Sequence, residues 1–177
     1  MIDARDFLRK HGAAASGMAP PSSTAGKPDE EQQRCYAAAV KSLEAAGTNE
    51  NGLRRRLRRK AYSAQAIDDT VNRLTRLGLL DDEEYAESLC RRCIRRQMGE
   101  QGFLRQCRAK GVDLTMARMI AAEARGQGLF ERSAEAFATD LASRIVAADA
   151  QVRRRRLVSA IRAKGQDWNL VRKYLDF

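Results

Sequence analysis

The feature that most constrains the fold is a short basic motif that occurs three times in the chain. It consists of two apolar residues four positions apart, followed three positions later by a lysine, and it reads Leu53-x3-Leu57-x2-Lys60, Phe103-x3-Cys107-x2-Lys110 and Leu157-x3-Ile161-x2-Lys164. Residues at i and i+4 share one face of a helix. The spacing therefore predicts three short basic helices in a tandem repeat of roughly 50 residues.

The residues after each lysine also repeat. A small residue comes first, and the residue three positions beyond the lysine has a side-chain oxygen that can cap the next helix. The small residues are Ala61, Gly111 and Gly165, and the predicted caps are Ser63, Asp113 and Asp167. Apolar pairs at helical spacing follow the caps, as Ile67 with Val71, Ala117 with Ala121, and Val171 with Leu175. We therefore expect a second helix in every copy.

Longer helices are expected before each copy, over residues 31–46, 82–98 and 130–148, because apolar residues recur there at steps of three and four. All three prolines, Pro20, Pro21 and Pro28, precede this region, so it lacks the strongest helix breaker. The prediction is an all-α protein: a flexible segment over 1–30, then three-helix modules over 31–80, 81–128 and 129–177. Stacked repeats contact only their neighbours, so we expect an elongated, curved array.

Positive charge is concentrated in three arginine clusters. The chain has 33 Lys and Arg against 23 Asp and Glu, a formal net charge of +10. We predict contact with a polyanion, because guanidinium groups bind phosphates and carboxylates bidentately; the alternative is a solvated helix face. Aromatic residues, at 6%, are too scarce for a row of base-stacking platforms. The candidate contacts are Arg54, Arg55, Arg56, Arg58, Arg59, Lys60, Arg91, Arg92, Arg95, Arg96, Arg153, Arg154, Arg155 and Arg156.

No catalytic, metal or cofactor site is predicted. The one histidine, His11, lies in a Gly/Ala/Ser/Pro-rich segment, which excludes the usual nucleophile–histidine and multi-histidine sites. Cys90 and Cys93 are expected to be buried small hydrophobic residues, since they fall on the apolar face of a helix and no second C-x2-C occurs. The acidic stretch at 81–84 is expected to cap that helix, with Asp81 as N-cap and Glu84 completing a capping box.

One stretch resembles a known family. Residues 78–86, Gly-Leu-Leu-Asp-Asp-Glu-Glu-Tyr-Ala, closely resemble the GLLDD…[FY]A signature of bacterial RecX regulatory proteins, and Lys110-Gly111 resembles the KG of their later modules. The resemblance covers about residues 35–177. The chain departs from the family pattern at Gly52-Leu53, where members have Glu-Leu, and at Ala61, where they have glycine before an aromatic residue.

The resemblance implies a modulator of the RecA recombinase, and thus a role in regulating DNA repair, homologous recombination and the SOS response. It implies a curved row of modules in the groove of the RecA–DNA filament, where the protein inhibits ATP hydrolysis, filament growth and strand exchange without being an enzyme. Its partners would be RecA and single- or double-stranded DNA, without sequence specificity. The alternative is a free-standing helix-turn-helix-like DNA-binding protein or transcription regulator. We expect a cytoplasmic protein, since no secretory signal or membrane-length apolar run occurs, and an elongated monomer fits the repeat best.

Overall fold

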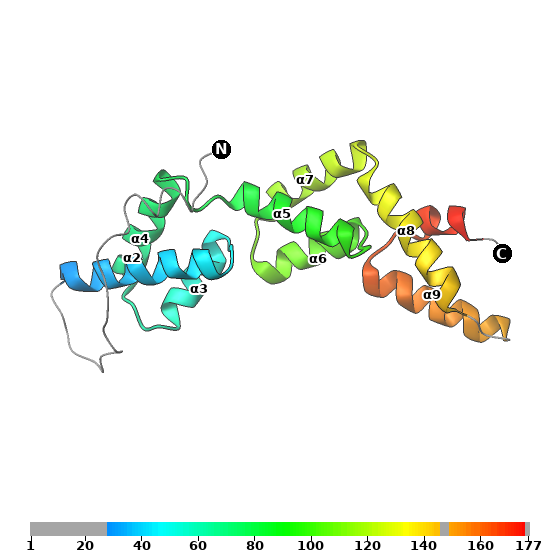
Figure 1. Cartoon of the computed structure of the whole chain (residues 1–177), viewed down its shortest axis with the longest axis horizontal. Helices are drawn as coiled ribbons and strands as arrows, with labels where there is room; N and C mark the ends of the chain where they lie inside the picture. The colour runs from blue at the N-terminus through cyan, green and yellow to red at the C-terminus, as the bar shows by residue number, and fades with distance from the viewer. Residues whose placement is uncertain (1–27, 146–148, 176–177) are drawn as a thin grey trace. The chain divides into compact units, whose positions relative to one another are not determined.

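The structure, a computed structural model, describes residues 28–145 and 149–175, and within these ranges it contains helices and no strand (Figure 1). The predicted all-α repeat fold is thus confirmed. None of the described helices is both long and apolar enough to cross a bilayer. The helices are α2 Pro28–Ala45, α3 Glu50–Arg58, α4 Ala64–Arg76, α5 Asp82–Arg95, α6 Glu100–Lys110, α7 Leu114–Gly126, α8 Leu129–Arg144, α9 Ala150–Lys164 and α10 Trp168–Val171, followed by the 3-10 turn Arg172–Tyr174.

Each copy of the repeat contributes its apolar pair to a separate hydrophobic core. Leu53 and Leu57 are buried among residues of α2 and α4, Phe103 and Cys107 among residues of α5 and α7, and Leu157 and Ile161 among residues of α8 and α10. Residues 51–60 and 101–110 even share the same pattern of burial, position by position. The sequence repeat is therefore a repeat of packing.

The described residues form two compact units. One contains 28–46 and 53–80, and the other contains 47–52 with 81–145 and 149–175. The second unit holds two of the three cores, and α8 contributes to both: Phe130 lies in one, while Phe137 and Leu141 lie in the other. The division into three modules at 81 and 129 stays a prediction.

The predicted caps are confirmed in all three copies. Ser63 Oγ accepts the N–H of Ala66 at 3.3 Å, Asp113 Oδ1 that of Met116 at 2.9 Å, and Asp167 Oδ1 that of Asn169 at 2.6 Å. Each cap satisfies a backbone donor that has no partner within its own helix.

The small residue after each lysine adopts a left-handed conformation. Its φ is +60° at Ala61, +76° at Gly111 and +62° at Gly165. Gly111 and Gly165 are the C-caps of α6 and α9, whereas Ala61 lies in the turn that follows the end of α3 at Arg58. The conformation is open to glycine without steric cost, whereas a Cβ makes it unfavourable. The left-handed backbone therefore explains why a small residue follows each lysine. Ala61 adopts this conformation despite its methyl group.

Several helix boundaries differ from the prediction. α2 begins at Pro28, three residues early, because proline suits the first turn and Asp29, Glu30 and Glu31 complement the helix dipole there. The rest of the predicted flexible segment, 1–27, lies outside the described residues. α5 ends at Arg95, and α8 ends at Arg144; residues 146–148 of its predicted span also lie outside.

Gly102 lies inside α6, close to its start, and Gly99 precedes the first residue of this helix. A Cβ on Gly102 would fall 2.3 Å from the carbonyl oxygen of Lys164, and one on Gly99 would fall 2.3 Å from that of Gly165. The Gly99 N–H donates to Lys164 O at 3.2 Å. These glycines allow the start of α6 and the end of α9 to meet backbone to backbone.

Candidate polyanion-binding surfaces

The arginines of α3 divide into internal and exposed side chains. Arg56 Nη1 donates to Ser42 O at 3.1 Å, to Ser42 Oγ at 2.9 Å and to Ala46 O at 3.1 Å, which satisfies carbonyls at the C-terminal end of α2. Arg54 pairs with Asp68, and its side chain is only 19% exposed. Both guanidinium groups are therefore engaged inside the first unit.

The other basic residues of this cluster are exposed. Arg55, Arg58 and Arg59 make no side-chain hydrogen bond or ion pair within the described part of the chain. Arg55 and Arg58 lie in α3, and Arg59 directly follows its last residue with its N–H donating to Arg55 O at 3.3 Å, so the three positions i, i+3 and i+4 share one face. Lys60 is exposed just beyond the end of α3. We call Arg55, Arg58 and Arg59 the α3 arginine face.

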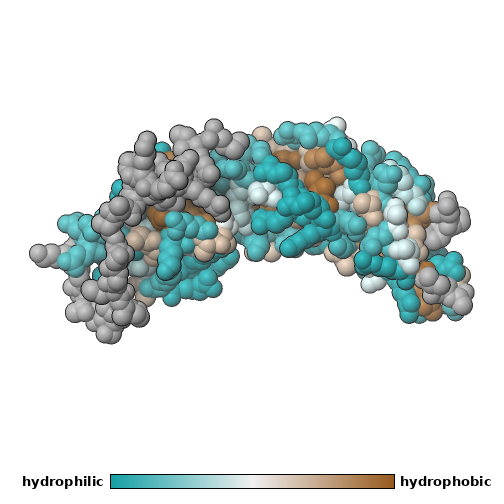
Figure 2. Space-filling model, in the orientation of Figure 1, coloured by the Kyte–Doolittle hydropathy of each residue, from teal (hydrophilic) through white to brown (hydrophobic). Residues whose placement is uncertain are grey.

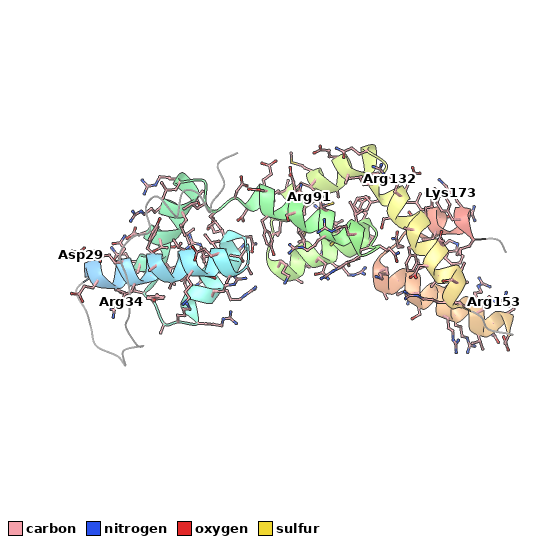
Figure 3. The ribbon with its side chains drawn as sticks, viewed as in Figure 1. Asp29, Arg34, Arg91, Arg132, Arg153 and Lys173 are labelled. Atoms are coloured by element: carbon pink, nitrogen blue, oxygen red, sulfur yellow. The ribbon has the colours of Figure 1, made fainter. Side chains whose placement is uncertain are left out.

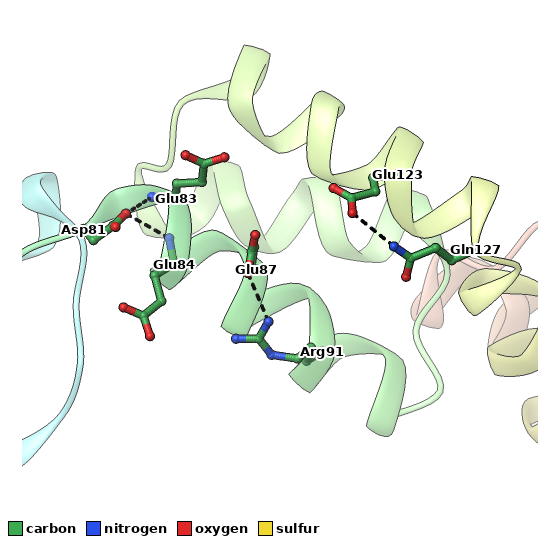
Figure 4. Close-up of polar contacts among 7 residues, drawn as sticks. All are labelled: Asp81, Glu83, Glu84, Glu87, Arg91, Glu123 and Gln127. Carbon is green, nitrogen blue, oxygen red and sulfur yellow. Dashed lines mark hydrogen bonds and ion pairs between the residues drawn. The ribbon is translucent and has the colours of Figure 1, made fainter. Parts of the chain in front are cut away.

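The second cluster lies on α5. Arg91 forms an ion pair with Glu87 at 3.2 Å, one turn earlier, and both side chains are about half exposed (Figure 4). Such a pair contributes little to stability in water and leaves the guanidinium accessible. Arg92 and Arg95 of α5 and its C-cap residue Arg96 are exposed at i, i+3 and i+4, the same arrangement as in the first cluster. We call these three the α5 arginine face.

The third cluster lies inside α9, which begins at Ala150 with Asp149 as its cap. Four consecutive residues cover about 300° of a helix, so they cannot share one face. Arg153, labelled on α9 in Figure 3, is partly buried and has an interaction within the structure, while Arg154, Arg155 and Arg156 are exposed. In the view of Figure 2, hydrophilic side chains cover much of the coloured surface, with smaller apolar areas between them.

The repeat register identifies exposed arginines outside the three clusters. Arg58 lies five positions after the first apolar residue of its copy, and Arg108 and Arg162 occupy the same position in the other two copies. All three are exposed. Each copy therefore presents one arginine at an equivalent place, and the alignment of the three motifs contains the signal that identifies Arg108 and Arg162.

Some basic residues of the repeat serve the ends of helices. Arg105 Nη2 donates to Arg162 O at 3.2 Å and to Ala163 O at 3.0 Å, at the C-terminal end of α9. Lys164 Nζ donates to Arg96 O at 2.7 Å, at the end of α5. Cations are favourable at helix C-termini, where backbone carbonyls lack partners. Part of the net positive charge is thus structural.

The acidic stretch before α5 behaves as a helix start. Asp81 Oδ1 accepts the N–H of Glu83 at 2.9 Å and that of Glu84 at 3.0 Å (Figure 4), which confirms Asp81 as the cap. Asp82 Oδ1 accepts the N–H of Glu50 at 2.7 Å, a contact that the sequence did not suggest. Burial raises the pKa of the Asp82 carboxyl.

The cysteines are buried, as predicted. Cys90, Cys93 and Cys107 lie in the core formed with α5, α6 and α7. Burial raises the pKa of the Cys90 thiol to about 11 and that of Cys107 to about 12, which keeps both protonated at neutral pH. The described residues contain no group of three or more His, Cys, Asp or Glu side chains placed to hold a metal ion.

Comparisons with known proteins show which proteins the chain is similar to. No family model matches the chain. The "Regulatory protein RecX" of Pelodictyon phaeoclathratiforme (strain DSM 5477 / BU-1) is 30% identical over 138 residues, which cover 77% of this chain and 84% of that protein. The crystal structure of RecX from Lactobacillus salivarius has a TM-score of 0.70 at 20% identity and covers 82% of this chain and 95% of that one. A second structure, described as regulatory protein RecX, has a TM-score of 0.72 at 16% identity and covers 97% and 86%.

Proposed function

The chain belongs to the RecX family of regulatory proteins, and from this membership we propose that it regulates the RecA recombinase by binding the RecA–DNA filament. The observation that carries the proposal is the pair of exposed arginine faces on α3 and α5, one in each unit. Each presents three guanidinium groups on one side of a helix. These groups can bind the phosphates of DNA or the carboxylates of a protein partner.

Such contacts bind a polyanion without reading its sequence. Phosphate contacts fix position and supply affinity, whereas specificity requires polar side chains that reach the edges of bases. The second helix of the second copy, α7, exposes Thr115, Arg118, Met119, Ala122, Glu123 and Arg125, and it contains no Asn, Gln or Ser to read bases beside its arginines. This composition favours binding to a nucleoprotein filament over the helix-turn-helix alternative.

The proposed action on RecA is steric and electrostatic. A protein bound along the filament occupies surface that incoming duplex DNA would use, and it shifts the filament toward the state that it binds more tightly. Filament growth, ATP hydrolysis and strand exchange would all be restrained. The protein acts in this proposal as a cytoplasmic monomer, without a cofactor and without catalysis of its own.

The test is RecA ATPase activity on single-stranded DNA, measured across a range of protein and salt concentrations. Wild-type protein is expected to lower the rate at amounts stoichiometric with RecA. Substitution of the α3 arginine face by alanine should require more protein for the same effect. It should also flatten the log–log salt dependence by roughly 0.7 to 0.9 for each phosphate that these arginines bind in the wild-type protein.

A matched control removes three positive charges elsewhere. Arg132, Arg144 and Lys173 lie in the second unit, where Arg144 pairs with Asp140 and Lys173 with Glu131; Figure 3 labels Arg132 and Lys173. Their replacement by alanine should leave inhibition close to wild type. An equal reduction of inhibition in both triple variants would mean that net charge alone matters. A wild-type protein without effect on RecA that instead prefers one duplex sequence would support the helix-turn-helix alternative.

A further inference from the structure

A groove in the second unit is not explained by the arginine faces. It lies between α6 and α9, has a volume of about 380 Å³, and ends at Trp168, the first residue of α10. Ile161 and Gly165 belong to its lining and are themselves buried. Its other lining residues are Gln101, Arg105, Val158, Arg162, Gln166 and Trp168.

Trp168 is the one tryptophan of the chain, and its exposure is unusual. The residue is 39% exposed and stands outside the hydrophobic core formed by α8, α9 and α10. Its indole N–H has no hydrogen-bond partner among the described residues. A large aromatic ring partly exposed at the edge of a groove, with Val158 also 38% exposed there, offers apolar surface to a ligand.

The charge around the groove has one sign. Arg105 and Arg162 line it, and no carboxylate does. Asp167 is next to Trp168 in sequence, but its Oδ1 is taken by the N–H of Asn169 at 2.6 Å, where it caps α10. A neighbouring hollow is lined by Glu100, Glu131 and Asp167 besides Arg125, so the two depressions differ in the ligand charge that they favour.

The basic side of the groove continues along α9. Arg155, Val158 and Arg162 stand at i, i+3 and i+7, so they share a face, and Arg155 is exposed two turns, about 10 Å, before Arg162. Arg105 is held in place from the other side by its bonds to Arg162 O and Ala163 O. The groove thus combines one aromatic face with a line of fixed and exposed guanidinium groups.

We propose that this groove is a nucleobase-stacking subsite for single-stranded nucleic acid, with a base on Trp168 and the adjoining phosphates on Arg162 and Arg155. Every nucleotide carries both a flat ring and a negative charge, so any register of the strand satisfies the site. An acidic peptide would need an aromatic residue at one fixed place among its carboxylates. The low aromatic content of the chain excludes a row of base-stacking platforms, but it is compatible with a single platform at Trp168.

The subsite does not depend on RecA, so its test uses the full chain alone. Because Trp168 is the sole tryptophan, its fluorescence reports this groove directly. A short oligothymidylate should quench the fluorescence in low salt. An abasic oligomer of the same length, which keeps the phosphates and lacks the bases, should bind more weakly and leave the fluorescence nearly unchanged.

Two variants separate stacking from charge. Trp168→Leu should weaken binding of a labelled oligothymidylate about 5- to 100-fold, the range for removal of one stacked base. Tyr174→Leu, at a residue that is 40% exposed and does not line the groove, is the matched control and should change affinity less than about twofold. Arg162→Gln should reduce the log–log salt slope by about 0.7, the value for one phosphate contact of a single strand.

The measurement with wild-type protein keeps the proposal testable even if a variant folds poorly. Equal quenching by the abasic oligomer would overturn base stacking. Unchanged affinity in Trp168→Leu would do the same. A fluorescence response to a glutamate- and phenylalanine-containing peptide, with none to oligothymidylate, would assign the groove to an acidic protein segment instead. Failure of RecA inhibition, by contrast, would leave this subsite untouched and would count against the proposed function alone.

Discussion

Ala61→Gly should stabilise the first unit. Ala61 has φ +60°, the left-handed conformation that Gly111 and Gly165 adopt at the equivalent positions. For a residue with a Cβ this conformation costs about 1–2 kcal/mol. Ala61 is exposed, so removal of its methyl group sacrifices no packing.

The expected gain is the difference of two terms. Relief of the left-handed strain contributes about 1–2 kcal/mol, and the greater freedom of glycine in the unfolded chain takes back about 0.4–1 kcal/mol. The middle of each range gives a net stabilisation of about 0.8 kcal/mol. Gly165→Ala should have the opposite sign and a larger size, because it combines φ +62° with a Cβ placed 2.2 Å from the Gly102 nitrogen.

Amide hydrogen exchange of α3 and α4 is the suitable assay, since it resolves the two units and does not require a single unfolding transition. Protection in these helices should rise about two- to fivefold in Ala61→Gly, the equivalent of about 0.5–1 kcal/mol. Protection in α6 and α9 should fall in Gly165→Ala. Lower protection in Ala61→Gly would refute the reasoning, because it would mean that the methyl group stabilises the helix end.

Three further predictions concern the interior. Leu57→Asp should cost several kcal/mol and unfold the first unit, since Leu57 is 1% exposed, and a decrease of helical circular dichroism would reveal it; a folded variant would contradict the core assignment. Arg56→Met should lower the stability of the first unit by about 1–2 kcal/mol in urea denaturation, because carbonyls at the end of α2 would be left without their donor. The control Arg55→Met should change this stability by less than about 0.5 kcal/mol. Equal effects of the two substitutions would contradict the internal role of Arg56. Cys90 and Cys107 have pKa values of about 11 and 12, above those of unfolded thiols, so their contribution to stability is complete below about pH 8.5 and is lost as pH rises toward 11 and 12. Labelling of these thiols at about pH 8 should therefore be slow until the protein unfolds. Rapid labelling of the folded chain would contradict their burial.

Sequence reasoning succeeded where the cause of the structure is local. The i, i+4 apolar pairs and the caps at Ser63, Asp113 and Asp167 depend on side chains within a turn or two of each other, and each is present in the structure. The small residues after the lysines are visible in the sequence, but their left-handed conformation is a property of the folded backbone.

It failed where the cause lies in another helix. The lack of a side chain at Gly102 allows the close approach of Lys164 O, and nothing near Gly102 in the sequence indicates this contact with a distant residue. Arg56 looks like any other arginine of its cluster, and only the packing of α3 against α2 brings it to Ser42 and Ala46. A charge count therefore overstates the number of arginines free to bind a partner.

Co-sedimentation with preformed RecA–DNA filaments over a salt series tests the central claim most directly. Wild-type protein should sediment with the filaments in proportion to RecA, more than with RecA or DNA alone, and should be released as salt rises. The variant with Arg55, Arg58 and Arg59 replaced by alanine should be released at lower salt than the variant at Arg132, Arg144 and Lys173. A wild-type protein that stays in the supernatant at low salt, or release of both variants at the same salt, would contradict the account.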